Sequence, residues 1–213
     1  LFVSWEYFAY RYYSPNRKDN MFIARQIRKE NVAEYILYIW QLEDLLRACR
    51  FDPDKIYATL LEGNDSLDDA QKREALEWYL DLATLMREED KAQIGHIDHT
   101  LHLINDLNDL HLRLLKLPVG EEYRAVFAPL SGELPKIKKA IESRQDITDI
   151  EACFRALYSV MLLRMKQIDK KEYINDVMEL ISPVIARLAA IYGQVERGEI
   201  DLYKGVDGDQ SGF

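Results

Sequence analysis

Residues 93–117 read QIGHIDHTLHLINDLNDLHLRLLKL and hold all four histidines of the chain. When this stretch is placed on a helical wheel at about 100° per residue, apolar side chains fill more than half of the circle. A narrow polar strip takes up the rest. An apolar arc of this breadth is typical of a helix that neighbouring elements cover on two or three sides. The stretch therefore predicts a central helix over Gln93–Leu117.

The composition of the whole chain also favours helices. Of its 213 residues, 48% are hydrophobic and 31% are charged, which is enough for a sizeable core. Nine glycines and six prolines gather at a few junctions, and this sparsity favours long helices over many short strands. We predict an all-α, single-domain bundle of six or seven helices, mostly antiparallel neighbours, over residues 21–204.

The two ends of the chain differ from this bundle. Residues 1–20 are crowded with aromatic side chains and lack the basic and apolar regions of a signal peptide. We expect Met21 to be the natural start and residues 1–20 to lie outside the core. The alternative is an aromatic arm that docks on a partner. Residues 205–213 predict a flexible tail.

Charge and cysteine content exclude some partners and locations. The formal net charge is −9, which argues against binding nucleic acid or an anionic membrane, because both need a positive field. No apolar run reaches the ~18–20 residues that span a bilayer. The two cysteines, Cys49 and Cys153, lie far apart in apolar helical patterns, as expected of free thiols in a reducing cytosol. We therefore predict a cytoplasmic protein, and no motif predicts a cofactor.

The first helix should run over Met21–Cys49 and be buried along one broad side. Asn31 falls inside the apolar sector, so we expect it to bond to a neighbouring helix. Trp40 points the opposite way, among charged residues. We expect a second element to cover this tryptophan, and the alternative is that it anchors an interface.

Capping residues mark several later helices. Asp52 followed by Pro53 is a favourable helix start. Ser66 is expected to cap a third helix, and Asp146 or Thr148 to cap a sixth. The last helix contains Pro183, where it should either kink or restart.

Four polar residues fall within the apolar arc of the central stretch: His96, Thr100, Asn108 and His111. Thr100 can bond to its own helix. The other three can pair with groups on neighbouring helices, such as Asn31. A pocket, if the fold has one, should lie beside them, so His96, Asn108 and His111 are the candidate binding residues.

The alternative is a metal site made of His99, His102 and Asp106, which share one side of a helix at i, i+3 and i+4 spacings. Such a site needs a further ligand from another helix, and no HExxH motif is present. His102 between two aspartates is more simply a charge pair along the helix. We therefore assign no metal, no catalytic residue and no nucleophile.

The runs MFIARQIRKENVAEYILYIWQLEDLLR at Met21–Arg47, Gly95-His96 and LNDLH at Leu107–His111 carry a resemblance. By these residues the chain resembles a family of uncharacterised all-helical proteins from Bacteroides-type bacteria, catalogued as a domain of unknown function. The likeness covers about residues 21–204. It implies a compact cytoplasmic helical fold and supplies no catalytic or binding residue.

The functional expectation is a non-enzymatic binding or protein-interaction module that contacts a protein partner or a second copy of itself. It depends on Trp40, on the aromatic leader, and on the lack of a catalytic motif. The alternative is a metal-dependent enzyme with its site on the central helix.

Overall fold

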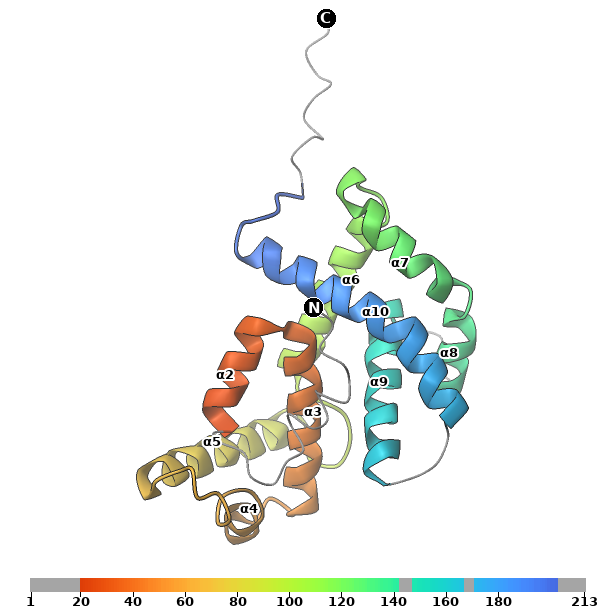
Figure 1. Ribbon diagram of the computed structural model, residues 1–213. Coiled ribbons are helices and arrows are strands. Elements are labelled where there is room, and N and C mark those ends of the chain that lie inside the picture. Colours follow the sequence, from red (N-terminus) through yellow and green to blue (C-terminus); the bar gives the residue numbers. More distant parts are fainter. Residues whose placement is uncertain (1–19, 142–146, 167–170, 203–213) are drawn as a thin grey trace, which may run out of the picture. The chain divides into compact units, whose positions relative to one another are not determined.

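Apolar residues at helical spacing, interrupted by capping residues, give an all-helical chain. The computed structural model describes residues 20–141, 147–166 and 171–202 (Figure 1). Within these ranges the chain forms nine α-helices and one short 3-10 helix, and it has no β-strand. The all-α class is therefore confirmed, but the prediction of six or seven helices is wrong. The predicted leader was residues 1–20; residues 1–19 lie outside the described residues, and Asn20 is the first residue of α2. The predicted tail at residues 205–213 also lies outside the described residues.

The chain divides into two compact units, and the prediction of one continuous bundle also needs correction. One unit ends at Leu103 and the other begins at Ile104, a point inside helix α6 (Asp98–Leu114). Each unit buries its own set of apolar side chains. The two are therefore described separately.

The first unit contains four helices before α6 begins. Their bounds are α2 (Asn20–Glu30), α3 (Val32–Ala48), α4 (Pro53–Leu60) and α5 (Asp69–Glu88). Helix α2 packs against α3, and α5 contacts α2, α3 and α4 (Figure 1). Helix α3 is therefore covered on more than one side, which explains why its buried residues include both Ile36 and Trp40.

The predicted helix Met21–Cys49 is two helices, because Asn31 ends the first and caps the second. Its side-chain oxygen accepts hydrogen bonds from the backbone N–H groups of Ala33, at 3.0 Å, and Glu34, at 3.2 Å. Asparagine is among the preferred N-cap residues for this reason. The expectation that Asn31 bonds to a neighbouring helix is wrong. Its side-chain oxygen accepts backbone N–H groups of the helix that it caps, and its side-chain nitrogen donates to Glu34 of that same helix.

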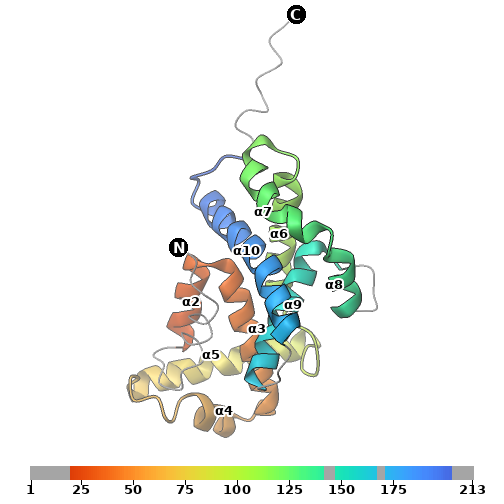
Figure 2. The same ribbon diagram turned by 45° about the vertical axis from the view of Figure 1, so that its right-hand side comes forward.

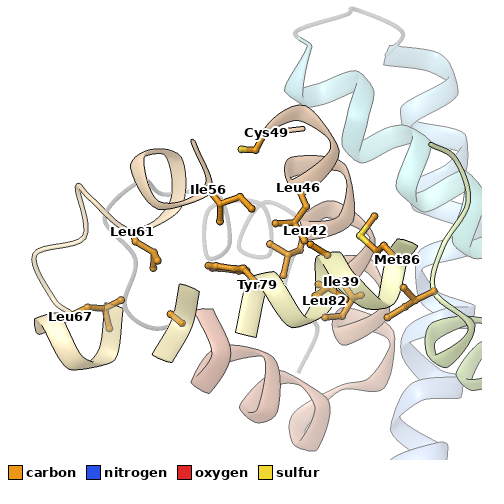
Figure 3. Packing of buried hydrophobic residues seen from close by; sticks show 13 residues of the cluster. Ile39, Leu42, Leu46, Cys49, Ile56, Leu61, Leu67, Tyr79, Leu82 and Met86 are labelled. Atoms are coloured by element: carbon orange, nitrogen blue, oxygen red, sulfur yellow. The ribbon is translucent and has the colours of Figure 1, made fainter. Parts of the chain in front are cut away.

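The core of the first unit is made mainly by α3, α4 and α5 (Figure 3). Leu61 and Leu67 from the segment between α4 and α5, and Ile97 from the segment before α6, complete it. Leu42 and Leu46 of α3 lie beside Tyr79 of α5, with Ile56 of α4 next to them. Full burial of each such side chain stabilises the fold by roughly 1.5–3 kcal/mol. The cluster consists of Ile39, Leu42, Leu46, Cys49, Ile56, Leu61, Leu67, Ala75, Tyr79, Leu82, Ala83, Met86 and Ile97.

Two of the predicted caps lie in this unit. Asp52 caps α4 as predicted, with Pro53 in the first turn. Helix α5 is capped by Asp68 and not by Ser66. Asp68 and Gln71 form a reciprocal capping box, which satisfies the backbone N–H groups of Asp68, Ala70 and Gln71.

The second unit holds the rest of α6 and the helices that follow it. Their bounds are η1 (Pro118–Gly120), α7 (Glu121–Ser131), α8 (Leu134–Ile141), α9 (Asp149–Met165) and α10 (Lys171–Glu196). Helix α10 packs against α7 and α9, and α8 packs against α9 (Figure 2).

Thr148 caps α9, as one of the two predicted alternatives. Helix α10 runs through Pro183 without restarting.

None of the helices in the described ranges is long and apolar enough to cross a membrane.

Candidate functional site

The predicted central helix begins later than its sequence pattern suggests. Helix α6 starts at Asp98, so His96 lies before the helix and not on it. Residues 91–97 form a loop between α5 and α6. Asp90, with φ 58°, and Gly95, with φ 87°, both adopt the left-handed conformation, which turns the chain away from a helical path. We call residues 91–97 the α5–α6 loop.

Arg47 of α3 holds the backbone of the α5–α6 loop. Its guanidinium donates hydrogen bonds to the carbonyl oxygen of Lys91, at 2.9 Å from Nη2 and 3.3 Å from Nε, and to the carbonyl oxygen of Gly95. Nη1 forms an ion pair with Asp44 at 2.7 Å. A guanidinium has five N–H donors in a planar fork, so one side chain can bind two carbonyls and a carboxylate together.

Glu43, one turn before Arg47, fixes the end of the same loop. Its side chain is fully buried, with 0% of its surface exposed. Oε2 lies 2.7 Å from Nδ1 of His96 and 3.7 Å from Nη2 of Arg47. Oε1 accepts the backbone N–H of Ile97 at 3.1 Å. Because a carboxylate only accepts hydrogen bonds, the short contact places a proton on Nδ1 of His96.

Trp40 completes the cluster and is 1% exposed. Its ring stacks on the imidazole of His96, with centroids 3.8 Å apart and planes 9° from parallel. Nε1–H donates to the hydroxyl of Thr100 at 3.0 Å, and that hydroxyl donates to the carbonyl of Ile97 at 2.9 Å. The expectation that a second element covers Trp40 is confirmed, and its alternative role as an interface anchor is wrong.

These contacts hold the α5–α6 loop at both ends while one large apolar side chain faces solvent. Ile94 is 80% exposed, the largest exposed fraction among the large hydrophobic residues in the described ranges. In the sequence, Ile94 lies between Lys91 and Gly95, whose carbonyl oxygens accept hydrogen bonds from Arg47. The cluster of Trp40, Glu43, Arg47 and His96 thus fixes the backbone that carries Ile94.

A second polar cluster lies in the second unit around His111, which is fully buried. Nδ1 lies 2.6 Å from the hydroxyl of Tyr123 on α7, and Nε2 lies 3.9 Å from Oδ2 of Asp149. The nearby carboxylate favours a proton on Nε2, so the Tyr123 hydroxyl donates to Nδ1. Burial lowers the pKa of His111, and Asp149 opposes that shift. The neutral imidazole is therefore the form that packs in this core.

Groups around His111 are held in their neutral forms as well. Burial raises the pKa of Tyr123, and the neighbouring Cys153 and Asp149 raise it further. Burial, together with Asp149, raises the pKa of the Cys153 thiol to about 12, against an opposing effect of Lys138. Lys138 is paired with Asp149 at 2.6 Å. A thiol protonated in this way is a weak nucleophile, since the thiolate is the reactive form.

The residues of the metal hypothesis do not form a metal site. His99, His102 and Asp106 are exposed. His99 instead lies edge-on to the ring of Tyr35, with centroids 5.9 Å apart. In the part of the chain that the structure describes, no three His, Cys, Asp or Glu side chains are grouped so that they could hold a metal ion.

The three candidate binding residues are divided between the clusters. His96 belongs to the first unit with Glu43, whereas Asn108 and His111 lie one turn apart on the part of α6 that belongs to the second unit. Asn108 is half-buried. His96 bonds to Glu43 of α3, and Nδ1 of His111 bonds to Tyr123 of α7, as polar residues in an apolar arc require. Nε2 of His111 is buried without a hydrogen-bond partner among the described residues. A role in binding a ligand stays a prediction for all three.

Sequence reasoning missed Glu43 and assigned no role to Arg47. A signal for both was present, because Trp40, Glu43 and Arg47 follow one another at i, i+3 and i+7 on one side of α3. A tryptophan that shares one side of a helix with charged residues indicates that another element covers that side, because a large apolar ring favours burial. What the spacing could not show was which segment would cover it.

A family model described as "Domain of unknown function (DUF4924)" matches residues 21–199. No curated protein and no solved structure shows a significant similarity to the chain. The match agrees with the resemblance to a family of unknown function that the sequence motifs suggested.

Proposed function

Because the chain belongs to the DUF4924 family, a domain of unknown function, we propose its role from its geometry: it is a non-enzymatic protein-interaction module. Its contact with the partner is centred on Ile94 of the α5–α6 loop. The observation that carries this proposal is an isoleucine 80% exposed on a backbone that Arg47 and Glu43 hold in place.

The fixed backbone is what separates Ile94 from an ordinary exposed apolar residue. Single exposed hydrophobic side chains are common on protein surfaces and need no explanation. A flexible loop, however, loses backbone conformational entropy when it binds, at roughly 1–2 kcal/mol per residue that becomes fixed. The α5–α6 loop is already ordered by hydrogen bonds to two of its carbonyls and one of its N–H groups. An ordered apolar side chain is suited to act as an anchor.

The polar clusters support the same class of function. The carboxylate of Glu43 contacts His96, the backbone N–H of Ile97 and Arg47. The guanidinium of Arg47 binds loop carbonyls and Asp44. These contacts determine the position of a loop. In the second unit, the pKa of the Cys153 thiol is raised to about 12, which disfavours a nucleophilic role.

We further propose that the module acts in a bacterial cytoplasm and does not bind nucleic acid. Cys49 and Cys153 are free and buried, as is usual for proteins of reducing compartments. The net charge of −9 opposes contact with phosphate backbones. The bacterial source rests on the family resemblance given above.

A photo-crosslinking amino acid at position 94 tests the proposal. The full chain carrying the probe at position 94 is irradiated in lysate of the cells that express it, and the attached peptides are identified by mass spectrometry. The same probe at the exposed Glu62 serves as the control. We expect a defined partner peptide, either from another protein or from a second copy, at position 94 only.

Substitutions then test the contribution of the side chain. Ile94→Asp should weaken binding to the identified partner about tenfold or more, because burial of an isoleucine contributes roughly 1.5–3 kcal/mol. Gln93→Asp adds the same charge at the adjacent exposed position and should change affinity much less. Equal crosslinking at positions 94 and 62, or equal affinities of the two variants, would refute the proposal.

A further inference from the structure

We propose that His111 is an acid-sensitive latch of the second unit: when its imidazole takes up a second proton, the contact that it makes between α6 and α7 is lost and the surrounding core opens. The latch consists of His111 on α6 and Tyr123 on α7, with Asp149 of α9 beside them. It is independent of the contact proposed for Ile94, which belongs to the first unit.

The imidazole of His111 is enclosed by side chains of neighbouring helices. It is fully buried and lies edge-on to the rings of Tyr123 and Phe127 on α7, with centroids 5.7 and 4.7 Å away. The Tyr123 hydroxyl, 2.6 Å from Nδ1, is the one hydrogen-bond partner that the described residues give to the two ring nitrogens. A single polar contact between buried aromatic rings therefore joins α6 to α7 at this point.

This hydrogen bond has one possible direction when the imidazole is neutral. With a proton on Nε2, the Tyr123 hydroxyl donates and Nδ1 accepts. A second proton would occupy Nδ1, so that an N–H and an O–H would point at each other. The hydroxyl would have to turn, and its proton would lose its acceptor while Tyr123 remains fully buried. Because a buried donor without an acceptor is costly, the protonated imidazole disfavours the closed core.

The neighbouring charges do not compensate for a buried imidazolium. Oδ2 of Asp149 lies 3.9 Å from Nε2, and Oδ1 pairs with Lys138 of α8 at 2.6 Å. Cys153 of α9 supplies no negative charge, because the pKa of its thiol is raised to about 12. Among the described residues, Asp149 is the one charged group that raises the pKa of His111, and burial outweighs it.

The histidine of the first unit lacks this conflict. Nδ1 of His96 already carries a proton, which it donates to Glu43, and its ring is stacked on Trp40. A second proton would be added at Nε2 and would leave the bond to Glu43 in place. The reversal of a donor and an acceptor is therefore specific to the cluster of the second unit.

Hydrogen exchange of the full chain at pH 7.5 and 5.5, corrected for intrinsic exchange rates and followed by mass spectrometry, tests the latch. In the open core the imidazole titrates near its ordinary pKa of about 6.5, whereas burial lowers its pKa in the closed core. Opening therefore takes up a proton and is favoured as pH falls, by up to about tenfold between these two values. Peptides from residues 104–114 and from α7 should lose protection by up to that factor.

Two glutamine variants separate the latch from a general effect of acid. His111→Gln removes the titrating group and keeps an amide that can bond to Tyr123, so these peptides should lose most of their dependence on pH. His102→Gln is the matched control, because His102 is an exposed histidine of the same helix. It should respond to acid like the parent. Peptides from α3 should not distinguish His111→Gln from the parent.

A measurement on the parent keeps the test decisive if His111→Gln does not fold. The ¹⁵N chemical shifts of the His111 imidazole show which nitrogen carries the proton at pH 7.5 and how readily the ring becomes charged as pH falls. We expect the proton on Nε2 and a ring that charges less readily than that of His102. A proton on Nδ1, equal titration of the two rings, or equal acid responses of the parent and His111→Gln would overturn the latch.

Discussion

Glu43 fixes the end of the α5–α6 loop from a fully buried position, and Glu43→Ala should lower the free energy of unfolding by roughly 3–5 kcal/mol. The structure gives the parts of this loss. A hydrogen bond to a charged group, such as the 2.7 Å contact with His96, contributes about 1.5–3 kcal/mol. The N–H of Ile97 would be left buried without its acceptor, at about 1–3 kcal/mol. Glu43→Gln keeps an acceptor oxygen and the side-chain volume, so we expect it to lower the free energy of unfolding by about 1–3 kcal/mol.

Urea unfolding followed by far-ultraviolet circular dichroism measures these changes. Hydrogen exchange of residues 91–97 reports on the loop itself. The amide of Ile97 should lose protection in Glu43→Ala, where its acceptor is gone, and lose less in Glu43→Gln, which keeps an acceptor oxygen. Glu77→Ala is the matched control, because Glu77 is an exposed glutamate of the same unit. It should change stability by no more than about 0.5 kcal/mol.

A double-mutant cycle between Glu43→Ala and His96→Ala isolates their contact. Residues that share a hydrogen bond show coupling of about 0.5–3 kcal/mol, whereas independent residues show close to none. The reasoning is refuted if Glu43→Ala costs no more than Glu77→Ala, or if the cycle gives no coupling while the amide of Ile97 stays protected.

Three further predictions concern single positions. Gly120→Ala should lower the free energy of unfolding by about 1–3 kcal/mol or more, because the new Cβ would lie 1.8 Å from the carbonyl oxygen of Leu114, whereas Gly132→Ala meets no atom within 4 Å. Equal urea midpoints for these two variants would contradict the close approach. Burial lowers the pKa of His111, so the unfolded chain binds the proton more tightly and stability is lost as pH falls below about 6.5. His111→Gln should therefore show a smaller drop in unfolding free energy between pH 7.5 and 5.5, and an unchanged drop would count against this. Arg50 has φ 57°, a left-handed conformation that glycine adopts more readily than arginine. Arg50→Gly should therefore raise the free energy of unfolding, measured with urea, by about 1 kcal/mol. A decrease would show that the arginine side chain contributes more than its left-handed backbone costs.

The sequence was a good guide to helices whose ends carry strong local signals. Asp52 with Pro53, and Thr148, cap the helices that they were expected to cap. Asn31 was misinterpreted because apolar residues continue at helical spacing on both sides of it. Periodicity detects the helical parts but is insensitive to a break that one capping side chain makes. The same cause extended the predicted central helix back over His96.

The candidate site was predictable only in part, because its contacts join residues far apart in the chain. Helical spacing shows that Trp40, Glu43 and Arg47 share a side of α3. It cannot show that this side faces a loop, since the bonds from Arg47 to Lys91 and from Ile97 to Glu43 span 44 and 54 residues. The exposure of Ile94 was hidden for the same reason. It follows from the loop conformation, and not from its apolar neighbours in the sequence.

Helix α6 runs without a break through the point where the two units divide, between Leu103 and Ile104. Multidomain chains usually carry an exposed linker at such a boundary, where proteases cut and gene truncations succeed. Here a cut would expose unpaired N–H groups on one fragment and unpaired carbonyl groups on the other, up to about four each. Expression of either half alone therefore requires that residues 98–114 be kept whole in the fragment. The usual strategy of dividing a protein at its domain boundary would damage both products.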